Sequence, residues 1–177
     1  MQLIRCTAKL LRELGLPRDP RHEEPKFSFL GQWHANLIHI NRRKCILFVN
    51  DRTLFNIIVP DLSRAEIRNL SEQFTFTLSC VLASEGFPKN VVEKVMSEYE
   101  QVEIAKSADR SVLGSVNDLA FHYKHLILGA GGVHSWKVPD ITRQLNRMPM
   151  LAGTRNSKFP IDELRKLFAV QSNNARH

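Results

Sequence analysis

The stretch that most limits how this chain can fold runs from Trp33 to Pro60 and reads WHANLIHINRRKCILFVNDRTLFNIIVP. It contains three short apolar runs that are rich in β-branched or aromatic residues and bounded by Asn, Asp, Arg or Pro. Such runs predict strands, and the polar segments between them are short enough for hairpin turns. We therefore expect an antiparallel three-stranded meander. Its strands are predicted at 37–40, 45–49 and 54–59.

The middle run does not alternate between apolar and polar residues, which predicts a strand covered on both faces. Helices must supply that cover. Apolar residues at three- and four-residue spacing predict them at 63–84, 88–99 and 110–128. Ser63 and Glu66 have the spacing of a capping box, and Asp109 and Thr7 are expected to cap two further helix starts. Weaker patterns predict strands at 1–6 and 102–105, a helix at 7–16, and helices beginning at Pro139 and Pro160.

These elements predict the α+β class, with an antiparallel sheet centred on the three-stranded meander and packed by several helices. The length of 177 residues is enough for one domain with a sizeable core. We assign residues 1–150 to a single α+β domain. Residues 151–177 are assigned to a basic C-terminal extension with a short helix.

The composition is typical of a folded globular protein, with 43% hydrophobic and 24% charged residues. No apolar run approaches the roughly 18 residues that a membrane-spanning helix needs, so no membrane partner is expected. The N-terminus lacks the uninterrupted apolar segment of a signal peptide. Three widely spaced cysteines, Cys6, Cys45 and Cys80, are interpreted as reduced core residues. Together these features predict a cytoplasmic protein.

The formal net charge is +7, and residues 133–177 carry eight Lys and Arg against three Asp and Glu. A concentrated positive charge attracts phosphate-bearing partners, although it is also common on soluble proteins without such partners. An exposed tryptophan among cations can stack on a base, whereas a buried one would lock the C-terminal segment onto the core. The candidate nucleic-acid-binding residues are Arg42, Arg43, Lys44, Trp136, Lys137, Arg143 and Arg147.

A second candidate site is formed by Asp118, His122 and His125, which a helix would place on one flank. This spacing allows metal binding or acid–base chemistry, but a solvated helix face is the commoner outcome of such a pattern. His34 and His39 flank the first strand of the meander, and His39 can face a pocket or lie at a sheet margin. No cofactor is identified, and whether the protein is an enzyme stays open.

Two motif-based functions are disfavoured. Residues 129–132 read GAGG, but the predicted order is helix and then glycines, whereas a phosphate loop follows a strand and precedes a helix. Helix termination explains these glycines better. The chain also contains neither the GxSxG motif of many serine hydrolases nor the HExxH motif of many zinc proteases.

Three stretches resemble a family of small uncharacterised bacterial proteins. They are IRCTAKLL at 4–11, WHANL at 33–37 and RSVLGSVND at 110–118. The family's corresponding patterns are IRCTKKLL, WxANL and RSVLGSxND, so Ala8 stands where lysine is usual. The resemblance covers roughly residues 1–125 and implies a bacterial, cytosolic origin. It implies no catalytic residues.

Three functions follow as hypotheses. The first is a non-enzymatic module that binds nucleic acid or another polyanion through the hairpin tip and the basic C-terminal segment, with salt-sensitive affinity. The second is a small metal-dependent hydrolase that uses Asp118, His122 and His125. The third is a protein-interaction domain that forms a homodimer.

Overall fold

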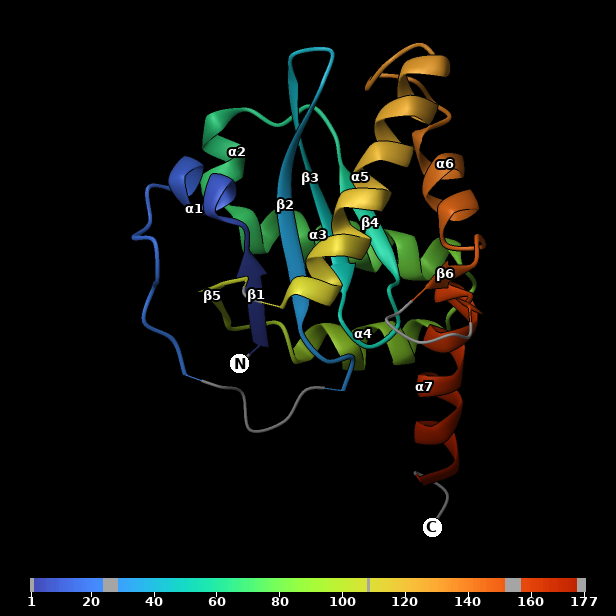
Figure 1. The fold of residues 1–177 in the computed structure, drawn as a ribbon. Coiled ribbons are helices and arrows are strands. Elements are labelled where there is room, and N and C mark those ends of the chain that lie inside the picture. The colour runs from blue at the N-terminus through green and yellow to red at the C-terminus, as the bar shows by residue number, and fades with distance from the viewer. Residues whose placement is uncertain (1, 24–28, 108, 152–156, 175–177) are drawn as a thin grey trace.

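The predicted meander is present and forms three strands of a five-stranded sheet in the computed structural model, which describes residues 2–23, 29–107, 109–151 and 157–174 (Figure 1). The fold class is α+β, as predicted. The elements, in chain order, are β1 (Gln2–Cys6), α1 (Ala8–Leu14), β2 (Trp33–Ile40), β3 (Arg43–Asn50), β4 (Asn56–Val59), α2 (Arg64–Arg68), α3 (Leu70–Ser84), α4 (Lys89–Ser97), β5 (Val102–Lys106), α5 (Arg110–Gly129), α6 (Val138–Leu145), β6 (Met150–Leu151), β7 (Ser157–Lys158) and α7 (Pro160–Asn174).

The sheet is mixed, with strand order β4-β3-β2-β1-β5. Strands β2, β3 and β4 pair antiparallel, whereas β1 pairs parallel with both β2 and β5. The meander therefore lies toward one edge of the sheet, and β4 is an edge strand. The parallel pairing of β1 with β2 and β5 was not predicted from the sequence. Long connections join these strands, and no local pattern specifies whether strands joined in this way pair parallel or antiparallel.

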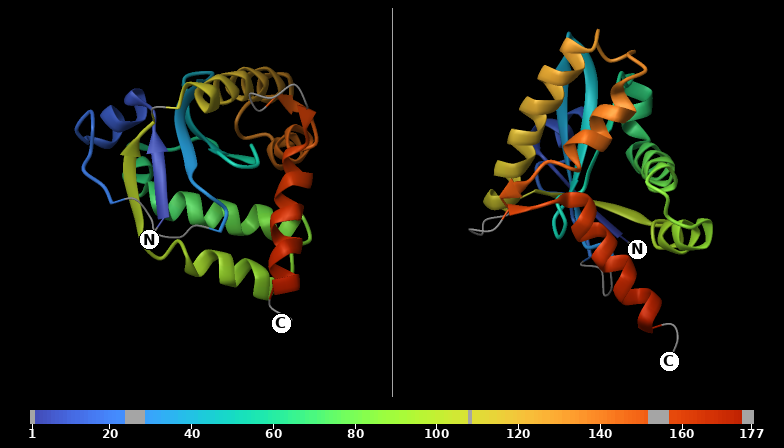
Figure 2. Two further views of the ribbon diagram at one scale, coloured as in Figure 1. Left: turned by 60° about the horizontal axis from the view of Figure 1, so that its bottom comes forward. Right: turned by 90° about the vertical axis from the view of Figure 1, so that its right-hand side faces the viewer.

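Helices cover both faces of the sheet, so the molecule has three layers (Figure 2). Alternate residues of β2 face opposite layers: Trp33, Ala35 and Leu37 pack in the core with α1, α2, α3, α4 and α7, whereas Ile38 and Ile40 pack in the core with α5 and α6. Both cores contain buried residues of β3, which explains why its sequence does not alternate.

The C-terminal helix α7 is part of the fold. Ile161, Leu164 and Phe168 lie in the same core as α3 and α4, and the Phe168 ring contacts the rings of Phe29 and Phe87 at centroid distances of 5.3 and 4.5 Å. The helix spans 15 residues and ends close to the C-terminus of the chain (Figure 1).

Several local predictions are confirmed and others are wrong. The Ser63–Glu66 capping box and the Asp109 cap are present. The helix predicted at 63–84 is broken at Asn69 into α2 and α3. Thr7 makes no cap hydrogen bond, because its hydroxyl instead contacts the Asn36 side chain.

The β2–β3 hairpin is tighter than expected. Its loop has only two residues, Asn41 and Arg42, which both have a positive φ. Two such residues are typical of the type I′ turn, whose twist matches that of a hairpin. Arg43 and Lys44 consequently begin β3. Among the described residues, no helix is long and apolar enough to cross a membrane.

Candidate functional site

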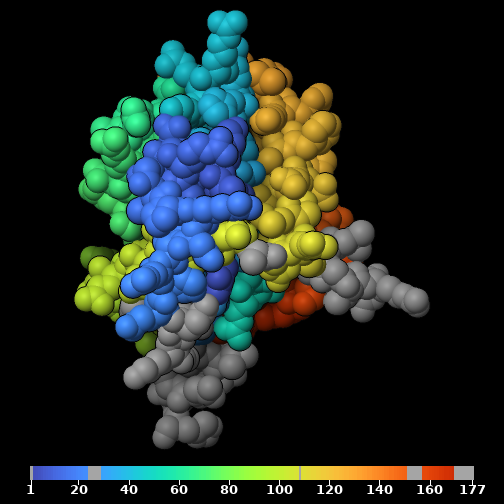
Figure 3. Space-filling view, turned by 60° about the vertical axis from the view of Figure 1, so that its left-hand side comes forward, coloured from blue at the N-terminus to red at the C-terminus, as the bar shows by residue number. Residues whose placement is uncertain are grey.

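The β2–β3 hairpin brings cations from four elements to one end of the molecule. In Figure 3 the hairpin tip stands at the top, with α1 below it, α2 to one side and the C-terminal part of α5 to the other. We call this group of cations the basic end. Its members are Lys9, Arg42, Arg43, Lys44, Arg64 and Lys124. Arg42, Arg43, Lys44 and Arg64 also line an open depression of about 420 Å³ between the hairpin and the start of α2.

His39 lies among these cations at the margin of the sheet. The Lys9 Nζ is 3.1 Å from the His39 Nδ1. Burial lowers the pKa of His39, and the charges of Lys9 and Lys44 lower it further. The imidazole is therefore neutral at pH 7 and accepts a hydrogen bond from the lysine. Burial is the main cause of this lowered pKa, and the smaller contributions of Lys9 and Lys44 show that their charges act at the same place.

Carboxylates neutralise only part of the basic end. Lys44 pairs with Glu13, and Arg43 lies 3.5 Å from the Asp61 carboxylate. Glu66, which also lines the depression, is engaged in the capping box of α2. Within the described part of the chain, no carboxylate pairs with the remaining cations. These are Lys9, Arg42, Arg64 and Lys124.

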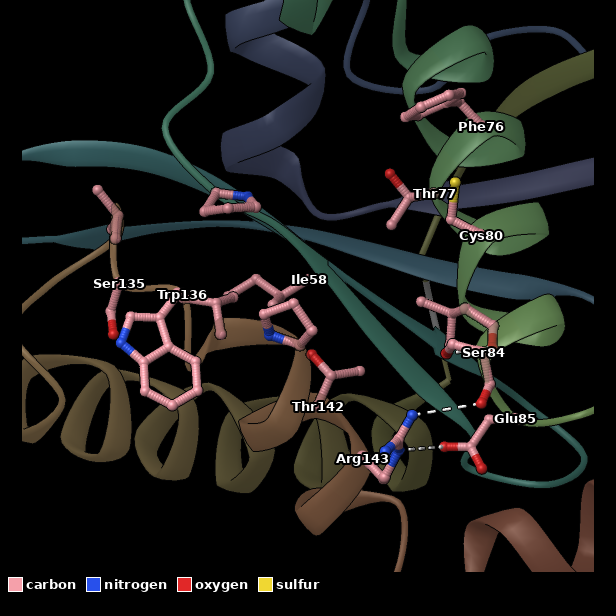
Figure 4. Close-up of a pocket in the computed structure, with 15 residues that line it drawn as sticks. Ile58, Phe76, Thr77, Cys80, Ser84, Glu85, Ser135, Trp136, Thr142 and Arg143 are labelled. Atoms are coloured by element: carbon pink, nitrogen blue, oxygen red, sulfur yellow. Dashed lines mark hydrogen bonds and ion pairs between the residues drawn. The ribbon is translucent and has the colours of Figure 1, made fainter.

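A second concave surface lies beside the edge strand β4, and we call it the α3–α6 groove (Figure 4). It has a volume of about 490 Å³, and its lining is mainly apolar. Helix α3 contributes Phe76, Thr77 and Cys80 to one side, and the α5–α6 loop with α6 contributes Trp136 and Thr142 to the other. The side chain of Phe76 is 69% exposed and that of Trp136 is 78% exposed. Large aromatic side chains so exposed at a concave surface are typical of binding sites.

One end of the groove is closed by a charged bridge between the two walls. Glu85, at the end of α3, accepts hydrogen bonds of 2.9 and 2.6 Å from the two terminal nitrogens of Arg147. Its carboxylate is also 3.8 Å from the Nε of Arg143, whose guanidinium donates to the Ser84 carbonyl. The single carboxylate of Glu85 balances one of the two positive charges of Arg143 and Arg147, and neither arginine lines the depression between the hairpin and α2, so we leave both residues out of the basic end.

The groove and the basic end are adjacent. Pro60 lines the groove, and the next residue, Asp61, lines the depression of the basic end. Asp61 also joins the two regions, because its carboxylate lies 3.5 Å from Arg43 and 3.3 Å from the Nε2 of His134. His134 precedes Trp136 by two residues. Trp136 and the hairpin cations, predicted as one set, therefore lie on neighbouring surfaces.

Asp118, His122 and His125 lie along α5, as the helical spacing predicted. Asp118 and His125 are exposed and His122 is half-buried, and both imidazoles contact the exposed Phe121 ring, at centroid distances of 5.8 and 6.5 Å. In the described residues, no group of three or more His, Cys, Asp or Glu side chains is arranged to hold a metal ion.

His34 occupies a buried polar site on the opposite side of β2 from Trp33. Its Nδ1 is 2.7 Å from the Ser107 hydroxyl, and its side chain is 3% exposed. Burial, and then the nearby Arg5, lower the pKa of His34 to about 4. The imidazole is neutral and links β2 to the segment between β5 and α5.

Sequence reasoning missed several members of these surfaces. Lys9, Arg64 and Lys124 are isolated cations in separate helices, and no local motif unites them. Phe76 sits off the apolar stripe of its helix, which was a usable signal that it is exposed. Cys80 was predicted to be a core residue, and this was wrong: it is exposed and lines the groove.

Two comparisons bear on identity. A protein-family model described as a domain of unknown function (DUF6933) matches residues 3–163. A search among curated proteins returned no significant match.

Proposed function

The chain belongs to the DUF6933 family of domains of unknown function, and we propose that it is a non-enzymatic module that binds nucleic acid or another polyanion through the basic end. One observation carries the proposal. Six cations from four separate elements gather around the hairpin tip, and four of them lack a carboxylate partner among the described residues.

This arrangement suits a phosphate backbone for a physical reason. Cations at a hairpin tip and on neighbouring helices present positive charge over an extended surface instead of in one enclosed pocket. A chain of phosphates contacts such a surface at several points and releases its bound counterions. Lys9, Lys44 and Lys124 each lower the pKa of His39 beyond the larger effect of its burial, so their charges converge on one point of the basic end before any ligand arrives.

Retention of labelled nucleic acid at several salt concentrations tests the proposal. The test variant reverses three exposed cations of the basic end, R42E/R64E/K124E. The matched control, R21E/K94E/R165E, makes the same change of net charge at exposed positions outside the basic end. We expect salt-sensitive binding by the wild type and the control, and a loss of at least about tenfold in the test variant.

Two results would contradict the proposal. One is the absence of retention at about 50 mM salt, where phosphate contacts are strong. The other is an equal loss of binding in both triple variants, because it would mean that net charge alone is responsible and that the basic end has no special role.

A further inference from the structure

The α3–α6 groove contains two exposed aromatic rings that the fold does not need for packing. Trp136 and Phe76 face solvent from opposite walls (Figure 4). The other tryptophan, Trp33, is fully buried and donates a hydrogen bond to the Tyr99 hydroxyl. Exposing an aromatic ring to water has a free-energy cost that a bound ligand removes. Rings in this position provide flat apolar surfaces for a planar ligand.

Charge complementarity indicates which planar ligand fits. Lys137 lies beside Trp136, with its Nζ 5.7 Å from the ring centroid, and it forms no ion pair with a described residue. The depression lined by cations of the basic end begins at Asp61, next to the groove residue Pro60, and Arg43 lies 3.5 Å from the Asp61 carboxylate. An apolar slot for a planar group is thus bordered by cations that suit phosphates, a combination found in proteins that bind single strands.

We propose that the polyanion is a single-stranded nucleic acid, with its phosphates along the basic end and Lys137 and with a base in the groove between Trp136 and Phe76. This inference rests on the proposed function and adds the class of ligand. A single strand can turn an unstacked base into the groove, whereas the bases of an intact duplex stay paired and stacked. A higher affinity for a single strand than for a duplex is therefore the property that this inference predicts.

The mainly apolar lining also suits an apolar protein segment. The bordering cations favour a nucleic acid over such a segment, because Lys137 and the hairpin tip can bind phosphates but form no favourable contact with apolar side chains. The bridge of Glu85 with Arg143 and Arg147 closes the far end, so the strand is expected to leave the groove toward the basic end.

Fluorescence anisotropy with the full chain tests the inference. The probes are a labelled oligothymidine strand and a labelled duplex with the same number of phosphates. The variants are W136A and F76A, and the control is F121A, which removes a phenylalanine as exposed as Phe76 but outside the groove. Circular dichroism checks that each variant is folded.

We expect the single strand to bind more tightly than the duplex. W136A should weaken single-strand binding by about tenfold, in the range reported for loss of one stacked base, and leave duplex binding unchanged. F76A should act in the same direction, and F121A should have no effect. The single strand should also quench the emission of Trp136, since the buried Trp33 is shielded from it.

The binding data distinguish a failure of the stacking inference from a failure of the proposed function. Equal binding of both probes, unaffected by W136A and F76A, overturns the stacking inference and leaves the proposed function standing; the groove would then be free for a polypeptide. Absence of binding to either probe at low salt overturns both. Single-strand binding lost in R42E/R64E/K124E and weakened in W136A supports both.

Discussion

Asn146, the residue directly after α6, completes the free edge of the sheet by pairing with the main chain of Asn56. Its Oδ1 accepts a hydrogen bond of 2.8 Å from the Asn56 N–H, and its Nδ2 donates one of 2.7 Å to the Asn56 carbonyl. The Asn146 side chain thus makes the two main-chain hydrogen bonds that a neighbouring strand would make with this residue of β4. The Asn56 side chain in turn accepts a hydrogen bond of 2.7 Å from the buried Tyr123 hydroxyl, which ties β4 to α5 as well.

This pair predicts a large effect for N146A. The substitution leaves the N–H and carbonyl of Asn56 without partners in a site from which water is excluded, because both asparagines are fully buried. We expect the free energy of unfolding to fall by about 2–4 kcal/mol, measured by urea denaturation. Q144A, at an exposed position of α6, should change it by less than about 0.5 kcal/mol. Similar values for the two variants would contradict the assignment.

The Glu85 bridge predicts a measurable effect for E85Q. The Glu85 side chain is 2% exposed, so the neutral amide would face Arg147 without the charge that the guanidinium requires. Because both arginines remain partly in solvent, we expect a loss of only about 1–3 kcal/mol in the free energy of unfolding. E163Q, which removes the surface ion pairs of Glu163 with Lys166 and Lys158, should have a smaller effect. An E85Q variant as stable as E163Q would rule out a structural role for the bridge.

His34 predicts a dependence of stability on pH. The unfolded imidazole binds a proton below its ordinary pKa of 6.5, whereas the folded one does so only below about 4. The contribution of His34 to the free energy of unfolding is therefore fully present above pH 6.5. It falls as the pH drops toward 4 and stays constant below that value. The fall should reach roughly 3 kcal/mol relative to H34N, whose side chain does not titrate. Parallel stability curves for the two proteins between pH 7 and 4 would contradict the pKa assigned to His34.

The cysteines predict a selective chemical modification. Cys6 and Cys45 are buried, and burial raises the pKa of both thiols, so neither forms a reactive thiolate in the folded state. Cys80 is exposed in the groove. Iodoacetamide should label Cys80 alone in the native protein and all three cysteines in urea, as read by mass spectrometry of peptides. Labelling of Cys6 before unfolding would show that the core around β1 opens.

The strands of the meander and most helices could be predicted because their signals are local. The capping box at Ser63, the cap at Asp109 and the apolar runs on each side of the hairpin each depend on a few neighbouring residues. The break at Asn69 was not predicted, because the apolar spacing continues across it from Ile67 to Phe74. Spacing alone does not show where one helix ends and the next begins.

The sequence by itself determined the α+β class, the hairpin with its cations and the positions of most elements, because backbone preferences and apolar periodicity act over short distances. Only the tertiary structure decided which side chains meet. It placed Lys9, Arg64 and Lys124 beside the hairpin, paired Arg143 and Arg147 with Glu85, and exposed Trp136 opposite Phe76. These relations depend on how helices far apart in the chain pack on the two faces of one sheet. That packing is set by the combined burial of both cores, which no single segment of the sequence encodes.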